Sequence, residues 1–271
     1  MTAWTDTLFT MKPLIAALAA GALLMSAPQT QRKPLAGHVI VVDPGHGGRD
    51  SGARAGGLFE SDIVLAIGKV VAAALREEGA KVVMTREDQN NLKATAHGGN
   101  LQRQNLAARV ALADRVKADL FLSVHTNKYP EYPAAHGAQV FLGESPTPDQ
   151  QRLAESLMRE LGPLTNSQRM IDGRRPLYLM RHLKVTAVLI EFGFISNDRE
   201  RQLLTQPSYQ RQLAQAVARG VVAYYKIPAV TEQMPPSPVK NAHRRTLEPL
   251  PHRIAARRPA HENHIYPSAR A

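Results

Sequence analysis

The sequence predicts an α/β fold, because short apolar runs typical of strands alternate with longer segments of helical periodicity between His38 and Ile227. Hydrophobic residues make up 44% of the 271 residues and charged residues 21%, which is ordinary for a globular protein. This composition excludes a wholly disordered chain and a protein with many membrane spans. It indicates a domain that folds in water.

Strands are predicted at residues 38–44, 81–85, 119–125, 137–142 and 186–192. The first, HVIVVDP, is a continuous apolar run that ends at Pro-Gly, as in a strand buried on both faces. The last, TAVLIEF, is equally apolar, which favours a place in the middle of the sheet.

Helices are predicted at residues 61–78, 100–117, 149–161 and 207–225. The first carries apolar residues at helical spacing and is closed by Gly79, a residue favoured at the end of helices. The last begins at Pro207, and proline is acceptable in the first turn of a helix. Strands and helices therefore alternate through most of the chain.

The N-terminal segment, residues 1–35, is predicted to be a signal peptide or a membrane anchor. Its apolar run, residues 13–25, is shorter than the ~20 residues that a comfortable spanning helix needs, which favours a cleaved signal. Met25 fits poorly near a cleavage site at Ala27, so an uncleaved anchor stays open, as does a buried helix of a cytosolic protein. The folded domain is expected at residues 36–227.

The C-terminal segment, residues 228–271, holds eight prolines, seven Lys or Arg and few large aliphatic residues, so we expect a disordered basic tail. The tail is either a passive extension or a segment that adheres to an anionic polymer. The net charge of +11 indicates a polyanionic neighbourhood: nucleic acid, an anionic membrane surface or an acidic cell wall. Nucleic acid is disfavoured, because the basic excess of the tail lacks interleaved aromatic residues.

Four residues at the ends of predicted strands and helices have side chains suited to metal chemistry. His46 follows the first strand in DPGHGGRDSGA, Glu60 opens a helix, His125 ends the third strand, and Glu191 lies near the end of the last strand. Each alone has an ordinary structural explanation, such as a helix-capping acid or a hydrogen-bonded histidine. Together, two imidazoles and a carboxylate suit a zinc site that leaves one position open for water, with Glu191 placed as a general base.

Other chemistries have weaker support. The glycine-rich turn after the first strand also suggests phosphate binding, but the GxGxxG and GxxxxGKS/T patterns are both missing. The chain has no cysteine, which excludes disulfides, thiol catalysis and zinc held by cysteine. Any metal is therefore left to His, Asp and Glu.

Five ordered blocks, DPGHGG, GLFESDIVLAI, MTRED, RVALADRVKADLFLSVHTN and VLIEFGFISN, together resemble the zinc-dependent N-acetylmuramoyl-L-alanine amidases of the Amidase_3 family. The resemblance covers residues 37–226. It implies a single α/β domain with a mixed, mostly parallel sheet flanked by helices on both faces, and one Zn²⁺ per chain. It also implies that His46, Glu60 and His125 are the metal ligands and that Glu191 is the catalytic glutamate.

Four further positions bear on the resemblance. Arg86 and Arg109 match recurrent family positions, and we expect a structural or substrate-orienting role for them rather than a catalytic one. Ser61 stands where a lysine is common, and Phe192 stands where a small residue usually follows the glutamate. Phe192 is therefore expected to reshape the substrate pocket.

The implied activity is hydrolysis of the amide between the lactyl group of N-acetylmuramic acid and L-alanine in peptidoglycan. The protein is expected to be exported and to act in the cell wall or tethered to the membrane. Peptidoglycan is the expected substrate, and an anionic wall polymer can adhere to the tail. The protein is expected to reach the membrane only through an uncleaved N-terminal segment. Nucleic acid is not expected as a partner. We expect a monomer, because no dimerising heptad is visible.

The short form is similar to germination-specific amidases, which indicates spore cortex maturation or germination. General wall turnover or cell separation is the other physiological interpretation. Two other classes of function stay open: a different zinc-dependent wall hydrolase, either a peptidase or a deacetylase, and a non-catalytic wall-binding module.

Overall fold

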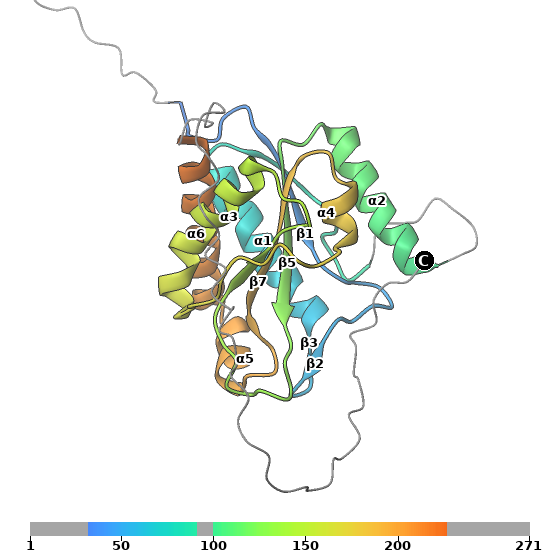
Figure 1. The fold of residues 1–271 in the computed structure, drawn as a ribbon, viewed down its shortest axis with the longest axis vertical. Coiled ribbons are helices and arrows are strands. Elements are labelled where there is room, and N and C mark those ends of the chain that lie inside the picture. The colour runs from blue at the N-terminus through green and yellow to red at the C-terminus, as the bar shows by residue number, and fades with distance from the viewer. Residues whose placement is uncertain (1–31, 91–99, 227–271) are drawn as a thin grey trace, which may run out of the picture. The chain divides into compact units, whose positions relative to one another are not determined.

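A computed structural model describes residues 32–90 and 100–226 of the chain (Figure 1). The basic tail and nearly all of the expected signal or anchor lie outside these residues, so the predicted domain boundaries remain predictions. Among the helices that are described, none combines the length and the apolar character needed to cross a membrane.

A five-stranded sheet forms the centre of the domain (Figure 1). Its strands are β1 (Val39–Pro44), β4 (Lys81–Met84), β5 (Leu120–Asn127), β6 (Gln139–Phe141) and β7 (Thr186–Phe194). The order across the sheet is β4-β1-β5-β7-β6, and all neighbours are parallel except β6, which runs antiparallel to β7. The predicted fold class, with a mixed and mostly parallel sheet, is confirmed, and β7 is interior as its sequence indicated.

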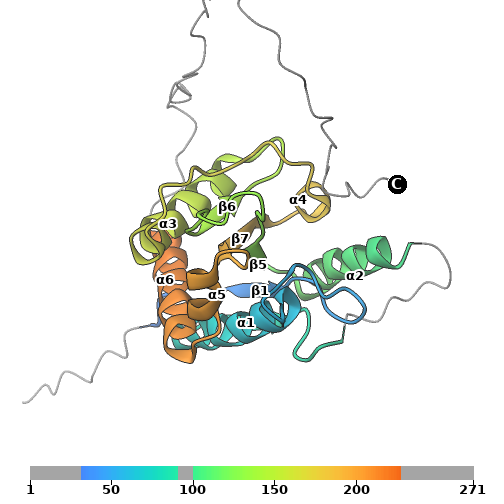
Figure 2. The same cartoon turned by 90° about the horizontal axis from the view of Figure 1, so that it is seen from below.

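Helices cover both faces of the sheet (Figure 2). They are α1 (Glu60–Glu77), α2 (Leu101–Val116), α3 (Pro148–Thr165), α4 (Tyr178–His182), α5 (Asp198–Leu204) and α6 (Pro207–Lys226). Helices α1, α3 and α6 share one hydrophobic core with the sheet, and α2 and α4 share another on the opposite face. Ile40 and Val42 of β1 point into the first core, whereas Val41 between them points into the second. Burial on both faces explains why these strands are continuously apolar.

Three short elements were missed by the sequence prediction: α4, α5 and the hairpin formed by β2 (Arg54–Ala55) and β3 (Leu58–Phe59). With two to seven residues each, they are too short to show a hydrophobic period. The predicted end of α3 at residue 161 was wrong, because the helix continues to Thr165 and ends at Asn166 in a left-handed conformation.

Candidate active site

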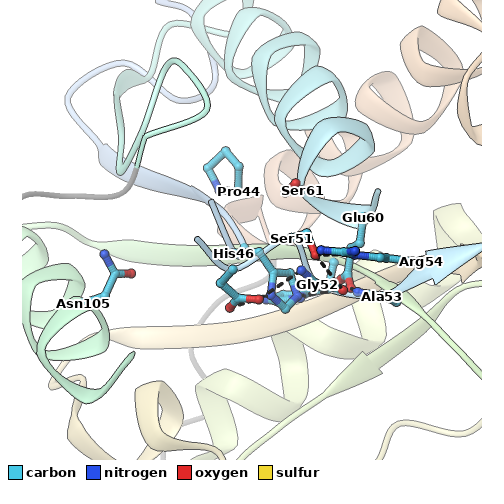
Figure 3. A network of polar contacts seen from close by, with 12 residues as sticks. Pro44, His46, Ser51, Gly52, Ala53, Arg54, Glu60, Ser61 and Asn105 are labelled. Atoms are coloured by element: carbon cyan, nitrogen blue, oxygen red, sulfur yellow. Dashed lines mark hydrogen bonds and ion pairs between the residues drawn. The ribbon is translucent and has the colours of Figure 1, made fainter. Parts of the chain in front are cut away.

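The site lies at the carboxyl ends of three adjacent strands, β1, β5 and β7. His46 follows β1, His125 is in β5, and Glu191 in β7 is paired in register with His125. Glu60 is the first residue of α1, whose start is directed toward the loop that follows β1 (Figure 3). Ligands of α/β proteins bind at this edge of the sheet, so the four predicted residues meet where a ligand is expected.

His46, Glu60 and His125 form a cluster that could hold a metal ion. His46 Nε2 lies 3.1 Å from Glu60 Oε2, and His125 Nδ1 lies 3.0 Å from Glu60 Oε1. The potential ligand atoms of all three residues are within 4.8 Å of one another. The structure thus brings together side chains that are 14 to 79 positions apart in the sequence.

Glu60 is buried and is held in place by two backbone N–H groups. The backbone N–H of Ala53 donates to its Oε2 at 2.9 Å, and the backbone N–H of Thr126 donates to its Oε1 at 3.0 Å. Burial opposes ionisation, but the contacts with His125 and then His46 outweigh it and lower the pKa of Glu60. A buried, ionised carboxylate between two imidazoles is an arrangement suited to a cation.

Asp50 orients His46. Its Oδ2 lies 2.9 Å from His46 Nδ1, while its Oδ1 accepts the backbone N–H of Gly52 at 3.0 Å. Burial lowers the pKa of His46, but the contacts with Asp50 and Glu60 outweigh this effect and raise the pKa to about 10. Ligating histidines usually donate their second ring N–H to a carboxylate, and Asp50 is placed to accept it. The sequence analysis missed Asp50, although it lies within the DPGHGGRDSGA segment.

The glycines of this segment are required by close contacts. A Cβ on Gly45 would lie 2.2 Å from the His125 ring. A Cβ on Gly52, which has a φ of 65°, would lie 2.7 Å from both His46 and Glu60. His46 itself has a φ of 59°, an unusual value for a residue other than glycine. The segment is therefore folded tightly around the cluster of His46, Glu60 and His125.

Glu191 is half-buried beside this cluster, and its Oε2 has no hydrogen-bond partner among the residues that the structure describes. Burial, and to a lesser extent the charge of Glu60, raise the pKa of Glu191 to about 8. A carboxylate with an unsatisfied buried oxygen is costly to retain, which indicates a function for this group.

Arg86 and Arg109 hold the backbone of the site. Arg86 donates to the carbonyl oxygens of Gly45 at 2.7 Å and Ser61 at 2.9 Å, and so joins the His46 loop to the start of α1. Arg109 donates to the carbonyl oxygen of His46 at 2.7 Å. These contacts are structural. A structural role was one of the two roles expected for Arg86 and Arg109, the other being orientation of the substrate.

Arg109 also forms a buried ion pair with Asp43, a residue that the sequence analysis missed. Asp43 is fully buried and accepts hydrogen bonds from Thr85 at 2.7 Å and Ser123 at 2.8 Å. Burial opposes ionisation, but Arg109, then Thr85 and Ser123, outweigh it and lower the pKa of Asp43. This network connects the carboxyl ends of three strands beneath the site.

A cavity of about 700 Å³ opens beside His46 and His125, within the usual size range of ligand sites. Its lining residues are Asp43, Gly45, His46, Gly48, Arg49, Asp50, Leu101, Gln102, Asn105, Leu106, Arg109, His125 and Leu179. Phe192 is absent from this lining and is fully buried in the hydrophobic core. Phe192 therefore does not line this cavity, and its side chain packs in the core instead.

Comparison with known proteins identifies the family of this chain. Residues 40–223 match the Amidase_3 family model, described as N-acetylmuramoyl-L-alanine amidase. The germination-specific N-acetylmuramoyl-L-alanine amidase of Bacillus subtilis is 34% identical over 71% of this chain and 81% of its own length. The N-acetylmuramoyl-L-alanine amidase LytC of the same organism is 31% identical over 72% of this chain but 37% of its own length.

Solved structures show the same similarity. The CwlD amidase from Clostridioides difficile, solved in complex with the GerS lipoprotein, superposes with a TM-score of 0.65 at 31% identity, over 70% of this chain and 98% of that one. The amidase AmiC2 of Nostoc punctiforme gives a TM-score of 0.59 at 31% identity, over the same shares of the two chains. The family model and the relatives agree: the chain belongs to the N-acetylmuramoyl-L-alanine amidase family.

Proposed function

We propose that this enzyme hydrolyses the amide between N-acetylmuramic acid and L-alanine in peptidoglycan, with one zinc ion held by His46, Glu60 and His125 and with Glu191 as general base. The observation that carries the proposal is the position of Glu191. Glu191 is paired in register with His125, a member of the three-residue cluster that could hold a metal, and its buried Oε2 has no hydrogen-bond partner among the described residues. Family membership supports the amidase over a wall peptidase, a deacetylase or a non-catalytic module.

The donor set fits zinc. Two imidazoles and one carboxylate are common ligands of catalytic zinc, and three protein ligands leave a position open for water. Asp50 contacts Nδ1 of His46 and so leaves Nε2 for the metal. The backbone N–H groups on Glu60 fix the carboxylate between the two rings.

The residues of the chain have separate tasks in hydrolysis. When bound, zinc supplies Lewis acidity, which activates water and polarises the scissile carbonyl. Glu191 accepts a proton from the attacking water and then delivers it to the alanine nitrogen as the C–N bond breaks. Burial raises the pKa of Glu191 to about 8, and a nearby cation lowers it again, so the group can both accept and release a proton near neutral pH.

We further propose that the enzyme acts outside the cytoplasm, on the spore wall. The 34% identity to a germination-specific amidase supports a role in spore cortex maturation or germination. The similarity to the probable cell wall amidase LytH of Staphylococcus aureus, at 32% identity, supports action at the wall and keeps vegetative wall turnover as the second physiological role.

The test is metal content measured together with the release of new alanine amino termini from purified peptidoglycan. We expect about one zinc per wild-type chain, no zinc and no activity in His125→Ala, and retained zinc without activity in Glu191→Ala. Glu155→Ala, an exposed glutamate on α3, serves as the matched control and should behave like wild type. Digestion of the wall by wild type without new alanine amines would contradict the proposed reaction.

A further inference from the structure

We propose that the groove between α2 and α4 binds the stem peptide of the substrate and that Arg103 and Arg181 recognise a carboxylate of this peptide. The inference rests on the proposed amidase function. It adds that the bound stem peptide extends from the metal-binding cluster along α2.

The groove consists of two adjoining cavities. The cavity at the metal-binding cluster extends from His46 and His125 to α2, and Figure 3 shows Asn105 on the side of α2 that faces the loop of His46. A second cavity of about 270 Å³ shares Gln102 and Leu106 with the first. Its other lining residues are Asn100, Arg103, Tyr178, Arg181 and His182. Helices α2 and α4 pack against each other (Figure 1). Because residues of both helices line the second cavity, the combined groove runs from the cluster to the region between them.

The far end of this groove is basic. Arg103 and Arg181 are exposed there, and none of the described residues that line the second cavity is acidic. The side chain of Arg181 contacts Glu144 at 2.9 Å, but both members of this pair are more than half exposed. Such a surface pair is weak and can give way to a carboxylate of a ligand.

The wall of the groove at α4 is held in position. The His182 ring stacks on the Tyr178 ring, with the two ring centroids 4.0 Å apart. His182 Nδ1 donates to the carbonyl oxygen of Tyr178 at 2.8 Å. Leu106 and Leu179 add apolar surface nearer the metal-binding cluster. A cationic end beyond an apolar stretch suits a ligand whose charge lies some distance from the bond that is cut.

The two arms of the substrate differ in charge. On the glycan side of the scissile amide the lactyl carboxyl group is consumed in the amide, so the sugar carries no charge. On the peptide side, the D-glutamate that follows L-alanine carries a free carboxylate. The basic end of the groove is therefore complementary to the peptide arm and not to the glycan arm.

The test compares two substrates that differ only at this carboxylate: N-acetylmuramoyl-L-alanyl-D-glutamate with its γ-carboxyl blocked as the methylamide, and the same compound with its α-carboxyl converted to the amide. For the zinc-loaded wild type we expect kcat/KM to be about tenfold higher for the acid, mainly through a lower KM, because a contact present before and during the reaction acts on binding. The double variant R103Q/R181Q should lose this preference. Arg115→Gln, an exposed residue on the same helix outside both cavities, should retain it.

The outcomes separate this inference from the proposed function. Alanine amines released with an unchanged preference in R103Q/R181Q, or no preference in wild type, would refute the peptide groove while leaving the amidase reaction intact. An equal loss of kcat on both substrates would assign the arginines a structural role and also refute it. Failure of wild type to release alanine amines from either substrate or from whole peptidoglycan would overturn the amidase function itself.

Discussion

Replacing Glu191 with glutamine should make the metal-free protein more stable than wild type at alkaline pH. In the folded wild type, burial raises the pKa of Glu191 from 4.5 to about 8. Below pH 4.5 the carboxyl group of Glu191 is neutral in both the folded and the unfolded chain, so its ionisation costs the folded state no stability. As the pH rises toward 8, the unfolded chain ionises while the folded chain stays protonated, so the wild type loses stability. Glutamine does not titrate and avoids this loss.

The size of the effect follows from the two pKa values. Each pKa unit corresponds to about 1.4 kcal/mol, and the titration between about pH 5 and pH 9 spans roughly three units, which gives an upper limit of ~4 kcal/mol. Glu191 is only half-buried, since Oε2 alone is inaccessible to solvent, and water screens the rest of the carboxylate. We therefore expect a relative gain of about 2 kcal/mol for the variant over this pH interval.

Urea unfolding of the chelator-treated proteins at about pH 5 and pH 9 measures this difference. Comparing the two pH values removes any pH-independent cost of the amide, and Glu155→Gln on the exposed face of α3 controls for the loss of one negative charge. Zinc should shrink the effect, because a nearby cation stabilises the ionised carboxylate. An equal stability difference between Glu191→Gln and wild type at both pH values would refute the idea that Glu191 is poorly solvated.

Three further predictions concern the support of the site. Asp50→Asn should weaken zinc binding by about 10- to 100-fold, measured by competition with a chromogenic chelator, because His46 loses the carboxylate that orients its ring. Arg109→Ala should lower the free energy of unfolding by about 3 kcal/mol in urea, since Asp43 is left as a buried charge, whereas Arg115→Ala should change it little. Zinc binding should release protons and should weaken as the pH falls, because the pKa of His46 is raised to about 10 and the metal must displace the proton on its ring. Calorimetry in buffers of different ionisation enthalpy measures this release, and the absence of any released proton would contradict the prediction.

Local patterns in the sequence were sufficient to predict the alternation of strands and helices and the α/β class. All five strands of the central sheet and the four long helices lie within a few residues of their predicted positions. These elements are long enough to repeat a hydrophobic period, and buried strands such as β1 show it as a continuous apolar run. The hairpin β2–β3 and helices α4 and α5 contain too few residues to repeat a pattern.

The sequence by itself also determined which side chains could perform the chemistry, because His46, Glu60, His125 and Glu191 stand at the ends of strands and at the start of a helix. Only the tertiary structure decided that they meet, since their proximity depends on the order β1-β5-β7 and on the register of His125 with Glu191. The same holds for the Asp43 network, the contact between Asp50 and His46, and the groove along α2. Local periodicity reports how a segment is buried, whereas contacts between residues far apart in the chain are set by how the sheet and its helices pack.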